Sequence, residues 1–158
     1  MYKPFFVTGI ATLLTLGCMW GAINLFNIGA ENDFAAVDYS WILAHGHAMV
    51  FGFVGVFIMG FSYQFFPKLK KASLWNPGLA FYSLPLMVAG IIIQTIAHLI
   101  APKIGFVFLG VMGGVIQVVA VFLFVVVMLK TFRQSEVRSN SGWLRVCRIR
   151  LVFDCCRS

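Results

Sequence analysis

Four long apolar stretches, none with a charged residue inside, limit what this chain can fold into. They run near Phe5–Phe26, Trp41–Phe66, Leu79–Ile100 and Ile104–Leu129. A helix of about 20 apolar residues crosses the hydrocarbon core of a bilayer. A segment in lipid must satisfy its own backbone hydrogen-bonding groups, and a helix does so. We therefore expect an all-α protein, a polytopic transmembrane helical bundle with four spans.

The composition excludes an ordinary soluble domain. Of the 158 residues, 61% are hydrophobic and only 11% are charged, and the mean hydropathy is +0.93. Soluble domains are about 25% charged. This chain lacks the polar surface that would cover it in water, so we expect the lipid bilayer to be its main surroundings.

The distribution of charge predicts the orientation. The connection Asn27–Ser40 holds three acidic residues and no basic one, whereas all of the 12 lysines and arginines except Lys103 fall on the other side. Because cytoplasmic loops carry the excess of Lys and Arg, we expect both termini in the cytoplasm and a multi-pass protein of the cell inner membrane. The net charge of +7 is then a topology signal, and we expect no nucleic-acid partner.

The chain changes character near Thr131. We expect a transmembrane domain over residues 1–132 and a basic, polar cytoplasmic tail over residues 133–158. The tail holds Cys147, Cys155 and Cys156. Their spacing fits no zinc pattern, and thiols stay reduced in the cytoplasm, so we expect free cysteines.

The three histidines are the candidate functional residues. His45 lies about four residues inside the second span, and His98 lies the same distance from the end of the third, so we expect both, with His47, at one depth near the outer interface. An imidazole in hydrocarbon is costly without a partner, which makes each a candidate functional residue. The alternative is a structural histidine, hydrogen-bonded across helices. Neutral imidazole ligates haem iron and copper, so His45, His47 and His98 are candidate metal ligands.

Helical spacing separates the roles of the first two histidines. Residues two apart on a helix point about 200° apart, so His45 and His47 cannot both ligate one iron from an unbroken helix. His45 shares its face with Met49 and Gly52. Gly52 predicts a flat slot for a planar macrocycle, and Met49 is a weaker candidate for an axial ligand. The alternative is helix packing through these glycines.

The third and fourth spans carry two further signals. Gln94 lies four residues before His98, so both share a helix face, and a hydrogen bond from Gln94 would fix the ring. Gly110 and Gly114 form a GxxxG pattern that allows close helix contact; the alternative is chance in a glycine-rich helix.

The segment "HGHAMVFGF", His45–Phe53, followed by Gly60–Phe61 and Pro67, resembles the NnrS family of membrane haem–copper proteins. The opening "YKPFFVTGI" is also similar to the start of that family. The same segment is similar to the second helix of cytochrome c oxidase subunit I, the haem–copper oxidase core. There the first histidine is an axial ligand of a b-type haem, a role that the resemblance assigns to His45.

The chain departs from these families in two ways. Ala48 stands where NnrS proteins usually have Glu between the second His and Met. Both families have many more than four spans, so we expect the chain to be part of a longer protein, with a shifted reading frame near Phe132.

The expected function is a haem-binding integral membrane protein resembling the NnrS family, involved in nitric oxide response or related respiratory metabolism. The cofactors implied are a b-type haem at His45, with Met49, Gly52 and His98 nearby, and copper as a second metal. Other membrane helices or subunits are expected partners, and the redox partner is open. The alternatives are a subunit I-like respiratory protein or fragment and a cofactor-free assembly or interaction protein.

Catalysis by this chain alone is not expected, because the spans offer no carboxylate as a proton relay and only three histidines. We expect His45→Ala to abolish a b-type haem spectrum and His47→Ala to have a milder effect.

Overall fold

The computed structural model describes the backbone of residues 2–71, 73–100 and 106–155, and the side chains of residues 2–35, 37–71, 73–100 and 107–134. These residues form helices and no strand. Four helical stretches are long and apolar enough to cross a membrane: Lys3–Glu31, Tyr39–Leu69, Pro77–Ile100 and Val107–Gln134. The predicted all-α bundle with four spans is therefore confirmed, and each predicted span overlaps an observed one.

The first two spans each contain a π-helical stretch. The first comprises α1 (Lys3–Thr12), η1 (Leu13–Met19) and α2 (Trp20–Glu31), and the second comprises α3 (Tyr39–His47), η3 (Ala48–Gly55) and α4 (Val56–Leu69). The short 3₁₀ helix η2 (Phe34–Ala36) lies between the spans. In η1 the wider turn is visible in the backbone, where the N–H of Trp20 donates to the carbonyl oxygen of Thr15. Such turns are often found at functional sites, and the second one, η3, begins directly after His47.

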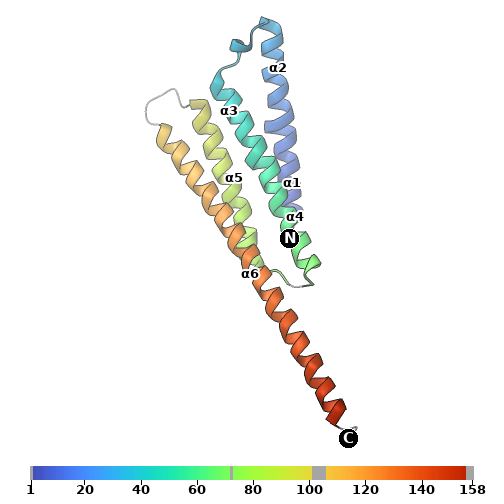
Figure 1. Ribbon diagram of the computed structural model, residues 1–158. Coiled ribbons are helices and arrows are strands. Elements are labelled where there is room, and N and C mark those ends of the chain that lie inside the picture. The colour runs from blue at the N-terminus through green and yellow to red at the C-terminus, as the bar shows by residue number, and fades with distance from the viewer. Residues whose placement is uncertain (1, 72, 101–105, 156–158) are drawn as a thin grey trace.

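The third and fourth spans form the most extensive helix pair. The third span is α5 (Pro77–Ile100), and the fourth is the first part of α6 (Phe106–Cys155). The two lie side by side in Figure 1. Glycines allow this approach: a Cβ added at Gly90 would lie only 3.0 Å from the carbonyl oxygen of Gly113. Small residues thus allow α5 and α6 to approach closely, but the tight contacts are at Gly90 and Gly113, whereas no atom lies closer than 3.6 Å to a Cβ added at Gly110 or Gly114, the predicted pair.

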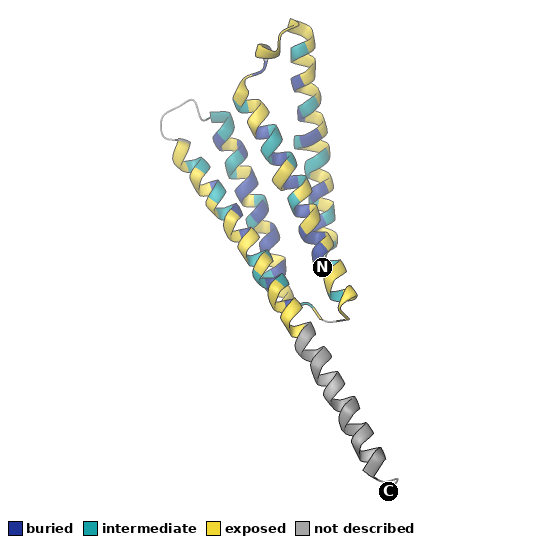
Figure 2. Cartoon of the chain, in the orientation of Figure 1, coloured by how far each residue is buried: buried dark blue, intermediate teal, exposed yellow. Residues whose placement is uncertain are grey.

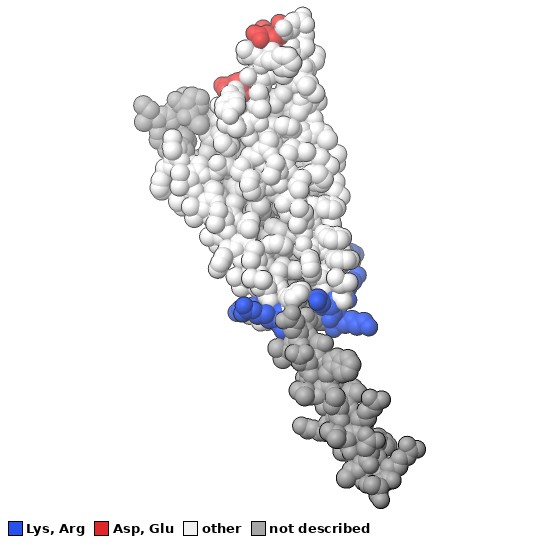
Figure 3. All heavy atoms as spheres, in the orientation of Figure 1, with Lys and Arg blue, Asp and Glu red and all other residues white. Residues whose placement is uncertain are grey.

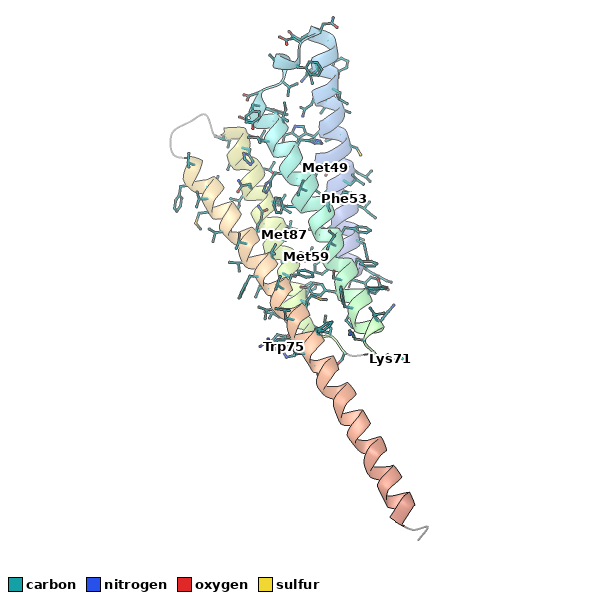
Figure 4. The ribbon with its side chains drawn as sticks, viewed as in Figure 1. Met49, Phe53, Met59, Lys71, Trp75 and Met87 are labelled. Carbon is teal, nitrogen blue, oxygen red and sulfur yellow. The ribbon has the colours of Figure 1, made fainter. Side chains whose placement is uncertain are left out.

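The hydrophobic core lies where all four spans meet. Phe5, Val56, Met87 and Val127, one from each span, are at most 1% exposed. Met59 packs in the same cluster, and Figure 4 labels Met59 and Met87 within it. In Figure 2 the residues coloured as buried lie mostly on the parts of the helices that face the other spans. Between 17% and 39% of each span's most apolar stretch is buried, so most apolar side chains face outward, consistent with lipid contact.

Charges lie at the two ends of the bundle. In the described part of the chain, Asp and Glu gather at one end and Lys and Arg at the other (Figure 3). At the basic end the N–H of Trp75 donates to Thr131 Oγ1 at 3.0 Å, and Lys130 Nζ lies 4.1 Å from the centre of the Trp75 ring. These contacts dock the α4–α5 connection on α6. Cytoplasmic placement of this end remains a prediction.

The backbone of α6 continues as one helix to Cys155, past the predicted boundary at residue 132. Apart from Arg133 and Gln134, the side chains of the predicted tail, including its three cysteines, lie outside the described residues.

Candidate functional site

Two of the three histidines lie together inside the bundle. His47 is the last residue of α3, and His98 lies near the end of α5. The centres of their rings are 5.8 Å apart, with 58° between the ring planes. Both side chains are partly buried. The structure therefore brings together, from separate spans, two of the residues that the sequence proposed as metal ligands.

A glutamine holds each of these rings. His47 Nε2 lies 2.9 Å from Gln117 Oε1 of α6. Because an amide oxygen only accepts hydrogen bonds, His47 Nε2 carries the proton and donates it. This leaves His47 Nδ1 with a free lone pair. Gln94 Nε2 donates to His98 Nε2 at 3.4 Å, which is the contact predicted from their spacing. We refer to these four residues as the imidazole–amide cluster.

The imidazole–amide cluster retains unused hydrogen-bonding groups. Gln117 is only 4% exposed, and its Nε2 atom is buried with no hydrogen-bond partner among the described residues. Gln94 Oε1 is also buried without a hydrogen-bond partner among the described residues. Leaving such a group unpaired costs about 1–3 kcal/mol. Buried polar atoms of this kind usually have a partner such as an ordered water or ion, so the cluster has capacity for one more ligand.

A cleft of about 350 Å³ lies beside His47. Its lining residues are His47, Phe51, Gly114, Gln117, Val118 and Val121. The Phe51 ring lies 4.6 Å from the His47 ring, at an angle of 31°. Gly114 leaves its wall flat, since the nearest atom to an added Cβ would be Gln94 Oε1 at 3.8 Å. Apolar pockets with a few polar groups, of roughly 300–1,000 Å³, are typical of small-molecule and cofactor sites.

The two rings are spaced suitably for one metal ion. Imidazoles that share a metal, with nitrogens 2.0–2.1 Å from it, have ring centres roughly 4.5–6.5 Å apart. The 5.8 Å between His47 and His98 falls within this range. No group of three His, Cys, Asp or Glu side chains gathers in the part of the chain that the structure describes, so the donors here are two imidazoles supported by amides.

His45 lies on the other side of the second span. Its Nδ1 donates to the carbonyl oxygen of Leu16 at 3.0 Å, and its Cε1 lies 3.2 Å from where a Cβ of Gly21 would be. The His45 ring therefore packs against the first span, whereas His47 faces α5 and α6. This separation agrees with the angle predicted from their spacing, and it leaves His45 apart from His98.

The rest of the His45 face also packs on the first span. The Met49 sulfur occupies the space beside Gly17, and the Thr12 methyl group lies 2.6 Å from where a Cβ of Gly52 would be. A cavity of about 170 Å³ remains next to Gly52 and Thr12. This face of the helix is therefore used for packing through the glycines, which was the alternative to a haem slot. The remaining cavity is smaller than the usual range for a cofactor pocket.

Sequence reasoning missed Gln117, which joins His47 to the fourth span. The signal was present, because Gln117 is the one amide within an otherwise apolar stretch of that span, and polar residues inside spans are functional candidates. It also missed Gly17 and Gly21, a GxxxG pair in the first span that receives Met49 and His45.

Comparison of the chain with protein families, curated proteins and solved structures found no match.

Proposed function

We propose that this chain is a haem-binding integral membrane protein resembling the NnrS family, involved in nitric oxide response or related respiratory metabolism. One observation supports the proposal most directly: two imidazoles from different spans, each held by its own glutamine, lie beside an apolar cleft. An imidazole that ligates haem iron or another metal usually donates its other ring N–H to a fixed acceptor, as His47 does to Gln117.

The surroundings of His47 suit a b-type haem better than those of His45. Phe51, Val118 and Val121 supply an apolar wall, and Gly114 allows a planar group to approach the helix. Beside His45 the first span fills the corresponding space. We therefore assign the axial ligand to His47, in place of the His45 that the resemblance implies. A bound haem would supply one-electron redox chemistry and a site for a diatomic ligand.

Copper is the second candidate. The 5.8 Å between the centres of the His47 and His98 rings supports one metal ion shared by two imidazoles. Imidazole suits copper. Gln117 accepts from His47 and would hold that ring in the ligating orientation, whereas His98 would release its bond from Gln94 so that Nε2 can bind the metal. His98 is thus the expected partner of His47 for either metal.

The test is a reduced-minus-oxidised spectrum of membranes that contain the full chain, together with metal analysis of the purified protein. We expect a b-type haem signal that disappears in His47→Ala and persists in His45→Ala. Loss of the signal in His45→Ala alone would return the ligand to His45. A folded protein with neither haem nor copper would overturn the proposal in favour of a cofactor-free interaction protein.

A further inference from the structure

A second pocket lies at the acidic end of the bundle, away from the imidazole–amide cluster. It has a volume of about 240 Å³ and is formed by α2, the start of α3 and the segment between them. Its lining residues are Ile23, Asn24, Asn27, Val37, Asp38 and Trp41. Unlike the cleft beside His47, this pocket has a carboxylate and two amides in its lining.

The most buried polar residue that lines this pocket has an amide oxygen without a hydrogen bond among the described residues. Asn24 is 8% exposed, and its Oδ1 atom is buried without a hydrogen bond among the described residues. Trp20, one helical turn earlier, is also 8% exposed and has an unpaired Nε1. Because a buried polar group without a partner is costly, this amide oxygen would be stabilised by a hydrogen-bond donor bound in the pocket.

Asp38 places a negative charge at the same pocket. Its Oδ1 caps α3 by accepting from the Ser40 N–H at 2.9 Å, and this leaves the second carboxylate oxygen for another donor. The acidic end also carries Glu31 and Asp33, and no lysine or arginine of the described residues lies there (Figure 3). The pocket is therefore suited to a cation and unsuited to an anion.

Trp41 supplies an aromatic wall. It lines the pocket, its side chain is 44% exposed, and its ring centre lies 5.3 Å from that of Trp20 at an interplanar angle of 69°. This edge-to-face contact steadies the indole. The face of a tryptophan ring attracts ammonium groups more strongly than that of other side chains.

We propose that this pocket binds an ammonium group, with the Asp38 carboxylate as counter-ion, Asn24 Oδ1 as hydrogen-bond acceptor and the Trp41 ring as the cation–π surface. The volume suits a small head group. Two sources share this chemistry: a free organic amine such as ethanolamine, and the ethanolamine head group of a phospholipid at the membrane interface. This site is independent of haem or copper at His47.

The test uses the full chain in phosphatidylcholine nanodiscs, titrated with ethanolamine and followed by calorimetry. We expect saturable binding that weakens at least about tenfold in Asp38→Asn, because a charge-assisted hydrogen bond is lost. Asparagine keeps the helix cap. Asp33→Asn is the matched control. Asp33 Oδ1 also accepts a capping hydrogen bond, from the Ala35 N–H at 2.9 Å, but Asp33 does not line the pocket. That variant should bind as the wild type does.

Asn24→Leu keeps the volume of the side chain and removes the acceptor, so binding should weaken in a protein whose circular dichroism is unchanged. Nanodiscs containing phosphatidylethanolamine separate the two sources. If the lipid occupies the site, mass spectrometry of the intact protein will detect bound phosphatidylethanolamine in the wild type and not in Asp38→Asn. Free ethanolamine will then compete with the lipid for the site. Absence of binding from both sources, or equal weakening in Asp33→Asn, would overturn the proposal.

Discussion

His47 and Gln117 are separated by 70 positions, yet His47 Nε2 lies 2.9 Å from Gln117 Oε1. This bond joins α3 to α6 at the cleft. Gln117 is itself wedged against α5, because its Cγ lies 2.6 Å from where a Cβ of Gly90 would be. The orientation of the His47 ring therefore depends on a contact between three spans. The same contact fixes the direction in which the free Nδ1 atom of the ring points.

Gln117→Leu removes the acceptor for His47 while keeping most of the side-chain volume. Loss of a residue that orients a metal ligand typically weakens metal binding roughly 10- to 100-fold. We expect a haem or copper affinity reduced by that factor, measured by titration of the purified protein. Gln64→Leu is the control, since Gln64 of α4 does not line the cleft; equal weakening in both variants would contradict the role of Gln117.

The fold was largely predictable because lipid imposes simple demands. A span must be long, apolar and helical, and each of these properties can be read from consecutive residues. The gathering of Asp and Glu at one end and of Lys and Arg at the other also follows from the sequence, because short connections between long helices leave the charges little choice of position.

The candidate site was only partly predictable. The spacing of His45 and His47 predicts that they face different neighbours, but it does not say which neighbour each one meets. That depends on how α3 packs, and the π-helical stretch Ala48–Gly55 had no recognisable signal in the sequence. Met49 and Gly52 were assigned to a cofactor slot because glycine leaves space; in the structure Thr12 of the first span lies in that space.

Two adjacent glycines of α6 should respond differently to alanine. A Cβ at Gly113 would lie 2.9 Å from the backbone nitrogen of Gln94, so Gly113→Ala must push α5 and α6 apart. Such overpacking typically costs about 1–3 kcal/mol. Gly114 has no atom closer than 3.8 Å to the added carbon and lines the cleft. Gly114→Ala should not destabilise the bundle, since helix propensity favours alanine by up to about 1 kcal/mol, but it should lower haem affinity.

Unfolding in mixed detergent micelles and haem titration of both variants measure these two effects. If Gly114→Ala binds haem with the wild-type affinity, the cleft is not the haem site. If Gly113→Ala is as stable as the wild type, the contact between α5 and α6 is looser than the structure indicates.

Gly60 allows α1 to approach α4, and Gly60→Ala should destabilise the bundle. The added Cβ would lie 2.6 Å from the Cβ of Phe5, a fully buried residue. We expect a loss of about 1–3 kcal/mol in the free energy of unfolding. Gly46→Ala in α3 is the control, because no atom lies within 4 Å of the added carbon there. Helix propensity alone should stabilise that variant by up to about 1 kcal/mol, and destabilisation of both would refute the steric explanation.

Tyr63 and Ser83 form a hydrogen bond between buried side chains of α4 and α5. The two oxygens are 3.1 Å apart, and because Ser83 Oγ donates to the Ala80 carbonyl oxygen at 2.7 Å, the tyrosine hydroxyl is the donor between them. Tyr63→Phe removes this bond but keeps the edge-to-face contacts with Phe5 and Phe124. We therefore expect a loss of about 0.5–1.5 kcal/mol, whereas Tyr63→Ala should cost about 3–5 kcal/mol because it removes the ring as well.

A double-mutant cycle separates the bond from the packing. Side-chain hydrogen bonds between membrane helices have coupling energies near 0.6 kcal/mol and at most about 1.7 kcal/mol. Tyr63→Phe, Ser83→Ala and the double variant should give a coupling in this range when unfolding is measured in micelles. Strict additivity would mean that the hydroxyls contribute nothing together. A haem spectrum that stays unchanged in all three variants would show that this core contact and the imidazole–amide cluster act independently, as their positions at different levels of α5 imply.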